Sequence, residues 1–193
     1  MKRCLILCAL AALAAGCGSS PPSHFYVLSA TATPGAAPSR LAVAVGPVTV
    51  PAVVDRPEIV VSTGPNQLQL DEFNRWAAPL QDNLSRVIAE NLVALLGTPH
   101  VTLFAQTLSA AADYRVAIEV QRFESTPGKS IALDALWTVR RMGDGKSQTG
   151  RTDARETVQD TSYAALAAAH SLGVARLSRD IAAAVQGLER AGQ

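Results

Sequence analysis

Two stretches of the chain carry hydrophobic residues at the spacing of an α-helix. The first has an apolar stripe that consists of Leu80, Leu84, Val87, Ile88, Leu92, Leu95 and Leu96. Such a stripe is typical of a helix that packs one face against a core. Pro79 suits the first turn of this helix, Gly97 suits a left-handed C-terminal cap, and Pro99 prevents the helix from resuming. The pattern therefore predicts a helix that begins near Pro79 and ends at Gly97.

The second stretch runs from about Tyr163 to Arg190 and is rich in alanine, which favours helix and permits close packing. Its apolar side consists of Tyr163, Leu166, His170, Val174, Leu177, Ile181, Val185 and Leu188. Residues 160–162 supply side-chain oxygens that suit a helix N-cap. The pattern predicts a long C-terminal helix with one buried side. We expect His170, which lies on that side, to be a packed and hydrogen-bonded core residue.

Elsewhere, apolar residues alternate with polar or small ones, which is the period of a β-strand. Residues 58–62 and 67–70 flank the turn residues 63–66, and this arrangement predicts a hairpin. Further strands are predicted at 24–29, 41–50, 101–105, 114–121, 131–139 and 147–159, the last of them exposed or at an edge. Pro47 and Pro51 cannot donate to a ladder, so the strand at 41–50 should be interrupted or lie at an edge.

Together these elements predict an α/β fold of the mixed α+β type. We expect a mixed, largely antiparallel β-sheet with two long helices packed on it. A length of 193 residues suits one such domain preceded by a short N-terminal segment.

The N-terminus has the pattern of a secretion signal. Lys2 and Arg3 precede an apolar run over residues 5–13, and the small residues Ala-Ala-Gly lead directly into Cys17. The run is shorter than the roughly 20 residues that a membrane-spanning helix needs. Residues 13–17, Leu-Ala-Ala-Gly-Cys, match a lipobox, in which the cysteine sulfur receives diacylglycerol and the freed amine receives an acyl chain such as palmitate. The alternative is an ordinary secretory signal with a chance cysteine.

Three segments follow from this interpretation. Residues 1–16 are a signal peptide, residues 17–40 are the lipidated N-terminus and its tether, and residues 41–193 form a single periplasmic domain. Cys4 and Cys8 lie in the discarded segment, so the mature chain has no other thiol for a disulfide, a metal or a nucleophile.

Charge and motif content exclude several classes of function. Removal of Lys2 and Arg3 leaves 15 basic and 16 acidic residues, which does not suit a nucleic-acid-binding protein. No catalytic motif, phosphate-binding loop or metal-ligand spacing is present in the sequence. We therefore predict no catalytic residue, no metal and no cofactor other than the covalent lipid on Cys17.

Residues 71–76 are the one dense group of candidate binding residues: Asp71, Glu72, Phe73, Arg75 and Trp76. The two carboxylates could form an acid/base pair, but carboxylates ahead of a helix more often complement its dipole or pair with a nearby arginine, here Arg75 or Arg56. The two aromatic residues either fill the core beside the helix start or form part of a patch that binds a partner protein.

The chain resembles the PqiC/YmbA family of auxiliary lipoproteins of ABC-type and MCE-type transport systems. The resemblance rests on residues 25–29, on 45–51, on Asp55-Arg56-Pro57, on 68–80 with its Glu-Phe-x-Arg-Trp-Ala-x-Pro-Leu block, and on 168–171. It implies an α/β domain that is attached to the outer membrane through Cys17 and assembles as a homo-oligomeric ring. It also implies a partnership with an MCE-domain tunnel protein and its inner-membrane transporter, and it implies no catalytic residue.

Two functions from different classes follow from the sequence. The first is a non-enzymatic subunit at the outer-membrane end of a phospholipid-conducting assembly, which maintains membrane integrity. The alternative is a lipid-binding module that shields an acyl chain in an apolar pocket. A hydrolase is a third and weaker hypothesis.

Overall fold

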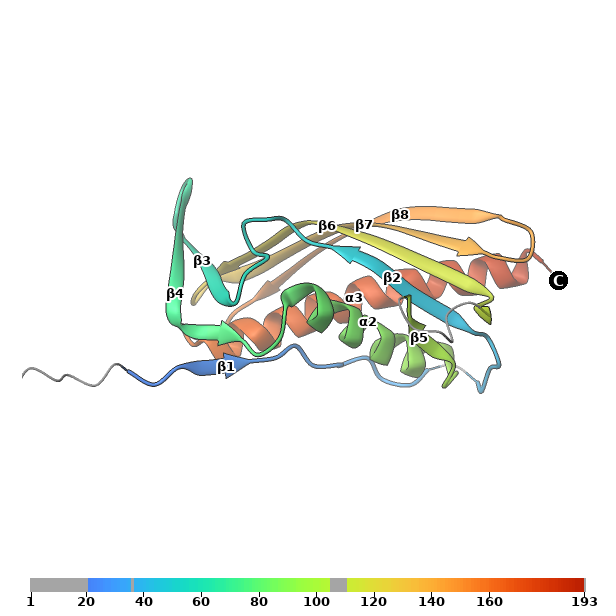
Figure 1. The fold of residues 1–193 in the computed structure, drawn as a ribbon, viewed down its shortest axis with the longest axis horizontal. Coiled ribbons are helices and arrows are strands. Elements are labelled where there is room, and N and C mark those ends of the chain that lie inside the picture. The colour runs from blue at the N-terminus through green and yellow to red at the C-terminus, as the bar shows by residue number, and fades with distance from the viewer. Residues whose placement is uncertain (1–20, 36, 105–110, 193) are drawn as a thin grey trace, which may run out of the picture.

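The computed structural model describes residues 21–35, 37–104 and 111–192. In chain order its elements are β1 (His24–Tyr26), β2 (Val43–Thr49), β3 (Glu58–Gly64), β4 (Gln67–Trp76), α2 (Leu80–Leu96), β5 (Val101–Leu103), β6 (Tyr114–Thr126), β7 (Ser130–Arg141), β8 (Ser147–Thr157) and α3 (Tyr163–Arg190). Five strands form one sheet in the order β5-β2-β6-β7-β8, and three form a second sheet in the order β1-β4-β3. Figure 1 shows an elongated molecule in which both helices run beneath the larger sheet.

Both sheets are mixed. In the larger sheet β2 pairs in parallel with β5 and with β6, whereas β6-β7 and β7-β8 are antiparallel. In the smaller sheet β4 pairs in parallel with β1 and antiparallel with β3. The predicted α+β fold class is therefore confirmed, but the strands divide between two sheets rather than one.

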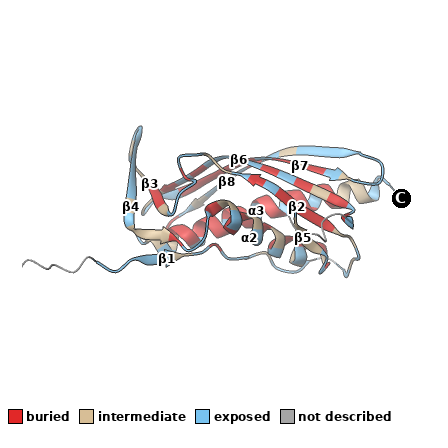
Figure 2. Ribbon diagram, in the orientation of Figure 1, coloured by how far each residue is buried: buried red, intermediate tan, exposed pale blue. Residues whose placement is uncertain are grey.

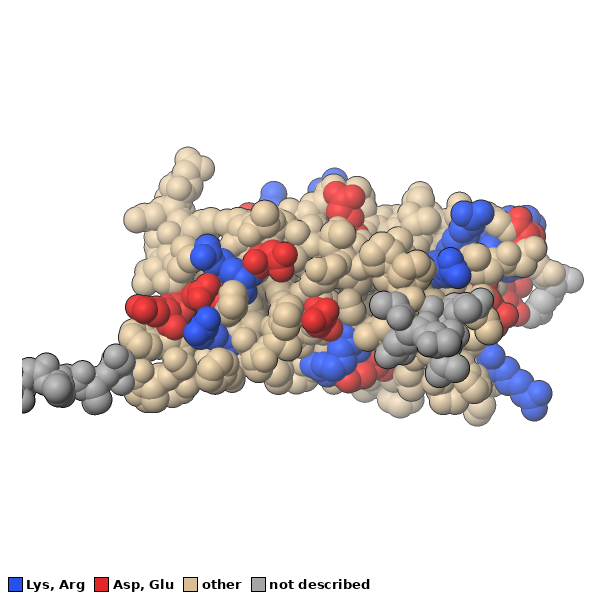
Figure 3. All heavy atoms as spheres, in the orientation of Figure 1, with Lys and Arg blue, Asp and Glu red and all other residues tan. Residues whose placement is uncertain are grey.

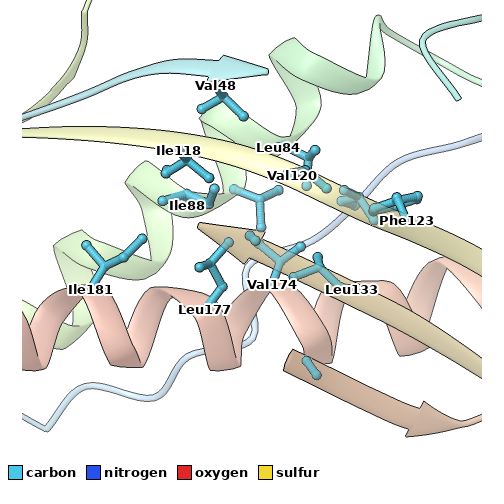
Figure 4. Packing of buried hydrophobic residues seen from close by; sticks show 14 of the residues in the cluster. Val48, Leu84, Ile88, Ile118, Val120, Phe123, Leu133, Val174, Leu177 and Ile181 are labelled. Carbon is cyan, nitrogen blue, oxygen red and sulfur yellow. The ribbon is translucent and has the colours of Figure 1, made fainter. Parts of the chain in front are cut away.

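The core lies between the larger sheet and the two helices. Figure 4 shows Leu84 and Ile88 of α2 and Val174, Leu177 and Ile181 of α3 directed toward the inward side chains of the strands. All five of these helix side chains are fully buried. Along β6 the inward residues alternate with outward ones that contact solvent, and Figure 2 shows this alternation as coloured bands on the sheet. β6 thus has one buried face and one wet face, whereas β2 and the first half of β7 have consecutive buried residues.

Both helices begin and end close to the predicted residues. Gly97 ends α2 with φ of 62°, a left-handed conformation that glycine adopts without steric cost. Ser162 caps the N-terminus of α3, where its hydroxyl accepts a hydrogen bond from the backbone N–H of Ala165 at 3.1 Å. Each cap is a residue adjacent to the helix end, so the sequence around that end is enough to predict where the helix begins or ends.

The strand that contains Pro47 is interrupted but does not lie at an edge, and Pro51 lies beyond its end. β2 lies between β5 and β6, and its register with β6 shifts between Val45 and Val48. The Gly46–Pro47 peptide bond within that shift is cis. Pro47 is therefore accommodated in a central strand at a point where its register with β6 shifts.

The β3–β4 hairpin projects from the body of the molecule at the end where β1 lies (Figure 1). Its tip is exposed, including Leu68 and Leu70, and residues 59–70 contain no charged side chain. Figure 3 shows this projection as an uncharged surface. Both predicted strands of the hairpin are confirmed, and β4 extends six residues beyond the prediction, to Trp76.

The chain between β1 and residue 32 is held against both helices by side-chain hydrogen bonds to its backbone. Leu28 is fully buried, and its N–H donates to Asn83 of α2. The N–H of Ser29 donates to Ser171 of α3, and those of Thr31 and Ala32 both donate to Asn91 of α2 at 3.1 and 3.0 Å. Part of the segment predicted as a tether is therefore docked on the folded domain.

Candidate functional site

Residues 71–76 form the second half of β4, where the strand turns from the projecting hairpin to lie beside β1. Asp71 pairs with Ile59 and Arg75 pairs with Glu58, so three residues of β4 bulge out between two consecutive residues of β3. The strand continues to Trp76, and only Ala77, Ala78 and Pro79 separate it from α2.

Asp71 organises this bulge. Its carboxylate accepts hydrogen bonds from the backbone N–H groups of Phe73 and Asn74 at 3.0 and 2.9 Å, which is the geometry of an Asx turn. Burial raises the pKa of Asp71, but a hydrogen bond from Tyr163 and those from Asn74 and Phe73 outweigh it, so the pKa lies below its ordinary value. The charged carboxylate therefore joins β4 to the first residue of α3.

The aromatic rings of Tyr26 and Tyr163 complete the junction. Their centroids lie 6.1 Å apart, and the Tyr26 hydroxyl donates to the Asn74 side chain at 2.7 Å. Burial, together with the Asp71 carboxylate, raises the pKa of Tyr163. Three separate parts of the chain thus meet at one hydrogen-bonded cluster at the end of the molecule.

Arg75 does not pair with the neighbouring carboxylates. It contacts Glu58 of β3 at 3.2 Å, and Arg56 contacts the same carboxylate at 3.2 Å. Glu72 is exposed and makes no ion pair among the residues that the structure describes. The expectation that Asp71 or Glu72 pairs with Arg75 or Arg56 is therefore wrong, because Glu58 lies directly opposite Arg75 in the ladder. The carboxylate of Asp71 is instead hydrogen-bonded within the bulge, and Glu72 is exposed.

The two aromatic residues of the block differ in environment. Trp76 is 5% exposed and packs edge-on against Phe123 of β6, with ring centroids 6.1 Å apart. Phe73 is half-buried. Trp76 thus fills the core between the two sheets, whereas Phe73 and Glu72 leave surface available for a partner. Binding by these two residues stays a prediction.

His170 also packs on Phe123. Its ring stacks on the Phe123 ring with centroids 3.8 Å apart, and its Nε2 lies 2.8 Å from the Ser125 hydroxyl. The expectation of a packed, hydrogen-bonded core histidine is confirmed. Its Nδ1 has no hydrogen-bond partner among the described residues. Complete burial lowers the pKa of His170 to about 3, so the ring is neutral in the folded protein.

Burial of neutral His170 predicts an acid-sensitive fold. In the unfolded chain His170 has its ordinary pKa of about 6.5. Below that pH the unfolded state therefore binds a proton on His170, whereas the folded state does not. The free energy of unfolding should therefore fall as the pH falls from about 6.5 toward 4, by about 1.4 kcal/mol per pH unit from this residue. Urea unfolding at pH 7, 6, 5 and 4, compared between the wild type and His170→Gln, isolates this contribution from that of the carboxylates. Equal pH dependence in both proteins would contradict it.

Two asparagines on the apolar stripe of α2 are structural residues that the sequence analysis did not single out. Asn83 and Asn91 are buried and accept the backbone hydrogen bonds of the docked N-terminal segment. Asn91 also donates to Ser178 of α3 at 3.3 Å. Asn83 and Asn91 lie eight positions apart among the apolar residues of one helix face. Because buried amides need hydrogen-bond partners, this pattern predicts that a segment outside the helix binds to them.

A cleft of about 460 Å³ lies between the hairpin and β6. Its apolar walls include Val53, Val54, Val60, Leu68 and Phe123, and its polar rim includes Arg122 and Glu124. A cleft of this size and lining is within the range of pockets that accept small apolar ligands. Gln67 and Gln121 also line the cleft.

The lipid-attachment candidate Cys17 lies outside the described residues. Within the described ranges, neither helix is both long enough and apolar enough to cross a bilayer. The same part of the chain holds no group of three or more histidine, cysteine or carboxylate residues placed to bind a metal ion. The predictions of no metal and no cofactor remain predictions.

Two solved structures have a similar fold. A crystal structure of a protein from Xanthomonas campestris has a TM-score of 0.71 at 20% sequence identity, covering 89% of this chain and all of that one. A crystal structure of an uncharacterized protein has a TM-score of 0.70 at 21% identity, covering 86% of this chain and 99% of that one. At these identities the likeness shows the fold alone. No curated protein matches the chain significantly.

The fold and the sequence define a class: an α+β fold whose described residues place two helices beneath a five-stranded sheet, preceded in the sequence by a lipobox-like motif. The sequence pattern of one family, described as the ABC-type transport auxiliary lipoprotein component, matches residues 26–182. The chain belongs to this family, and the predicted resemblance is confirmed.

Proposed function

We propose that this protein is a non-enzymatic auxiliary lipoprotein on the periplasmic face of the outer membrane. It serves an MCE/ABC-type system that moves phospholipid between the two membranes and so maintains membrane integrity. The observation that carries the proposal is the family match over residues 26–182, because the family is described as a transport auxiliary component and as a lipoprotein. The lipobox at residues 13–17 supplies the attachment site that this description requires.

The proposed mechanism is positional. Acyl chains on Cys17 confine the domain to the membrane plane, and this confinement raises its effective concentration for a partner that spans the periplasm. The partner is the MCE-domain tunnel protein, which connects to an inner-membrane transporter. Glu72 and Phe73, beside the Asp71–Tyr163 junction, are the proposed contact residues, and several copies form a ring around the end of the tunnel.

Affinity purification from crosslinked membranes tests this proposal. An epitope-tagged full chain should sediment with the outer membrane and recover an MCE-domain protein. The Glu72→Ala/Phe73→Ala variant should recover at least fivefold less of it, and Glu119→Ala on the outer face of β6 is the matched exposed control. Equal recovery of the MCE protein by all three would exclude this contact surface, and its absence from the wild-type sample would overturn the proposed partnership.

The cleft beside β6 favours a second candidate function, that of a module which shields an acyl chain. Its apolar walls come from Val54, Val60 and Phe123. Native mass spectrometry of the purified protein distinguishes the two functions. Phospholipid bound in addition to the covalent anchor supports the shielding role, and a protein that carries the anchor alone supports the docking role.

A further inference from the structure

An apolar groove lies beside β1 at the end of the molecule that the N-terminus enters. Its volume is about 480 Å³, and it is lined by Phe25, Val27 and Leu172 together with small or uncharged residues of α3. Phe25 and Val27 are 62% and 52% exposed, the two highest values among the large hydrophobic side chains of the described residues. Leu172 is 49% exposed. Contiguous exposed apolar surface of this kind marks a contact with another molecule or with a membrane.

The groove residues point outward because of the local structure. Tyr26 and Leu28 face the body, where Tyr26 packs on Tyr163 and Leu28 is fully buried, so the alternation of an extended chain directs Phe25 and Val27 away from it. On α3, Ala164, Ala168 and Leu172 are exposed and follow one another at intervals of four residues, which places them on one face of the helix. No lining residue of the groove is charged.

The distance from the predicted anchor decides which surface this end can reach. β1 is held in the sheet from His24 onward, so only seven Cα–Cα steps separate Cys17 from the folded body. Seven residues span at most about 25 Å when fully extended. α3, with 28 residues, is about 42 Å long at 1.5 Å per residue. The tether is thus shorter than the domain, and it holds the β1 end, rather than the opposite end, close to the membrane.

Charge at the border of the groove also suits a lipid surface. Arg176 lies one helical turn after Leu172 on the same face of α3, and Arg179 lies about one turn after Arg176. Both are exposed, and neither forms an ion pair in the part of the chain that the structure describes. Apolar side chains bordered by free arginines are the pattern of surfaces that rest in the interfacial layer of a bilayer, with the cations at the phosphates. Figure 3 shows an uncharged surface around β1.

We propose that the groove face, defined by Phe25, Val27 and Leu172, rests on the lipid surface beside the anchor. The proposal builds on the proposed function, since it takes Cys17 to be lipidated. The lipid on Cys17 then fixes the distance of the domain from the bilayer, and the groove face fixes its orientation. In that orientation the β1 end and the N-terminal part of α3 lie at the membrane, and the opposite end of the domain, with the β7–β8 turn, is directed away from it.

Depth-dependent quenching tests the proposal on the full lipidated chain. Because Cys4 and Cys8 lie in the predicted signal peptide and Cys17 is modified, Val27→Cys or Leu172→Cys introduces a single free thiol for a fluorescent label. Met142→Cys is the matched control, since Met142 is exposed to 39% and lies in the β7–β8 turn at the far end of the molecule (Figure 1). The proteins are reconstituted in phosphatidylethanolamine/phosphatidylglycerol vesicles that contain nitroxide-labelled lipid.

Labels at residues 27 and 172 should be quenched at least twofold more than the label at residue 142. Equal quenching at all three positions would overturn the proposal. Disulfide crosslinks between the Leu172→Cys chains of two copies, without quenching, would also overturn it, because a second copy would then cover the face. The mass of each purified protein separates this result from the proposed function: a chain without lipid on Cys17 refutes the anchoring, whereas a lipidated chain with equal quenching refutes only the orientation.

Discussion

Replacement of Cys17 by alanine should remove the protein from the outer-membrane fraction while leaving the domain folded. The cysteine sulfur is the atom to which diacylglycerol would be attached, and alanine offers no substitute. A single acyl chain binds a membrane only marginally, so stable anchoring needs the two or three chains that a lipidated cysteine carries. Among the described residues, no helix is long and apolar enough to cross the bilayer. We expect at least tenfold less protein in the outer-membrane fraction of a density gradient.

Cys8→Ala is the matched control, because Cys8 lies in the same segment of the precursor but outside the lipobox. It should fractionate like the wild type. Folding of the Cys17→Ala protein is checked by circular dichroism and by resistance to limited proteolysis. A variant that still sediments with the outer membrane would refute the role of Cys17. A variant that keeps residues 1–16 and sediments with the inner membrane is consistent with it, since the signal peptide then remains attached.

Replacement of Trp76 by alanine should lower the free energy of unfolding by about 3–5 kcal/mol, which is the usual cost of removing a large buried aromatic side chain. Trp76 is 5% exposed and packs against Phe123, whose ring in turn stacks on His170 of α3. This row of three rings joins the smaller sheet, the larger sheet and the C-terminal helix. Its loss should leave a cavity that the surrounding backbone cannot close.

Urea unfolding followed by circular dichroism measures this effect. Glu72→Ala, four residues earlier in the same strand and exposed, is the control and should change stability by no more than about 0.5 kcal/mol. The pair also separates two roles within one sequence block. If Trp76→Ala kept full stability but lost partner binding, Trp76 would be an interface residue and the packing argument would be wrong. If Glu72→Ala were strongly destabilising, the contact surface proposed for the block would have to be placed elsewhere.

The block of residues 71–76 illustrates why local sequence identifies important residues more readily than their roles. The carboxylate of Asp71 accepts hydrogen bonds within the bulge and from Tyr163. Arg75 forms an ion pair with Glu58, and Trp76 fills the core. Tyr163, Glu58 and Phe123, the partners outside the bulge, are all distant in sequence. A dense group of charged and aromatic residues therefore combines internal scaffolding with a small outward surface at Glu72 and Phe73.

The sequence by itself determined the elements whose causes are local. The stripe from Leu80 to Leu96 with Gly97 behind it defined α2, and Ser162 with the alanine-rich stretch defined α3. The turn residues 63–66 defined the hairpin. The lipobox at residues 13–17 and the Glu-Phe-x-Arg-Trp-Ala-x-Pro-Leu block are local patterns too, and they indicate the family.

Only the tertiary structure decided which strands pair and which partners the polar groups take. The division into two sheets, the central place of β2 and the pairing of both arginines with Glu58 depend on residues far apart in sequence. In β6 the register shifts between Val120 and Arg122, and the extra residue turns Phe123 inward where strict alternation would place it outward. Local periodicity records which residues are apolar, but pairing and burial are set by long-range contacts that no single stretch of the chain contains.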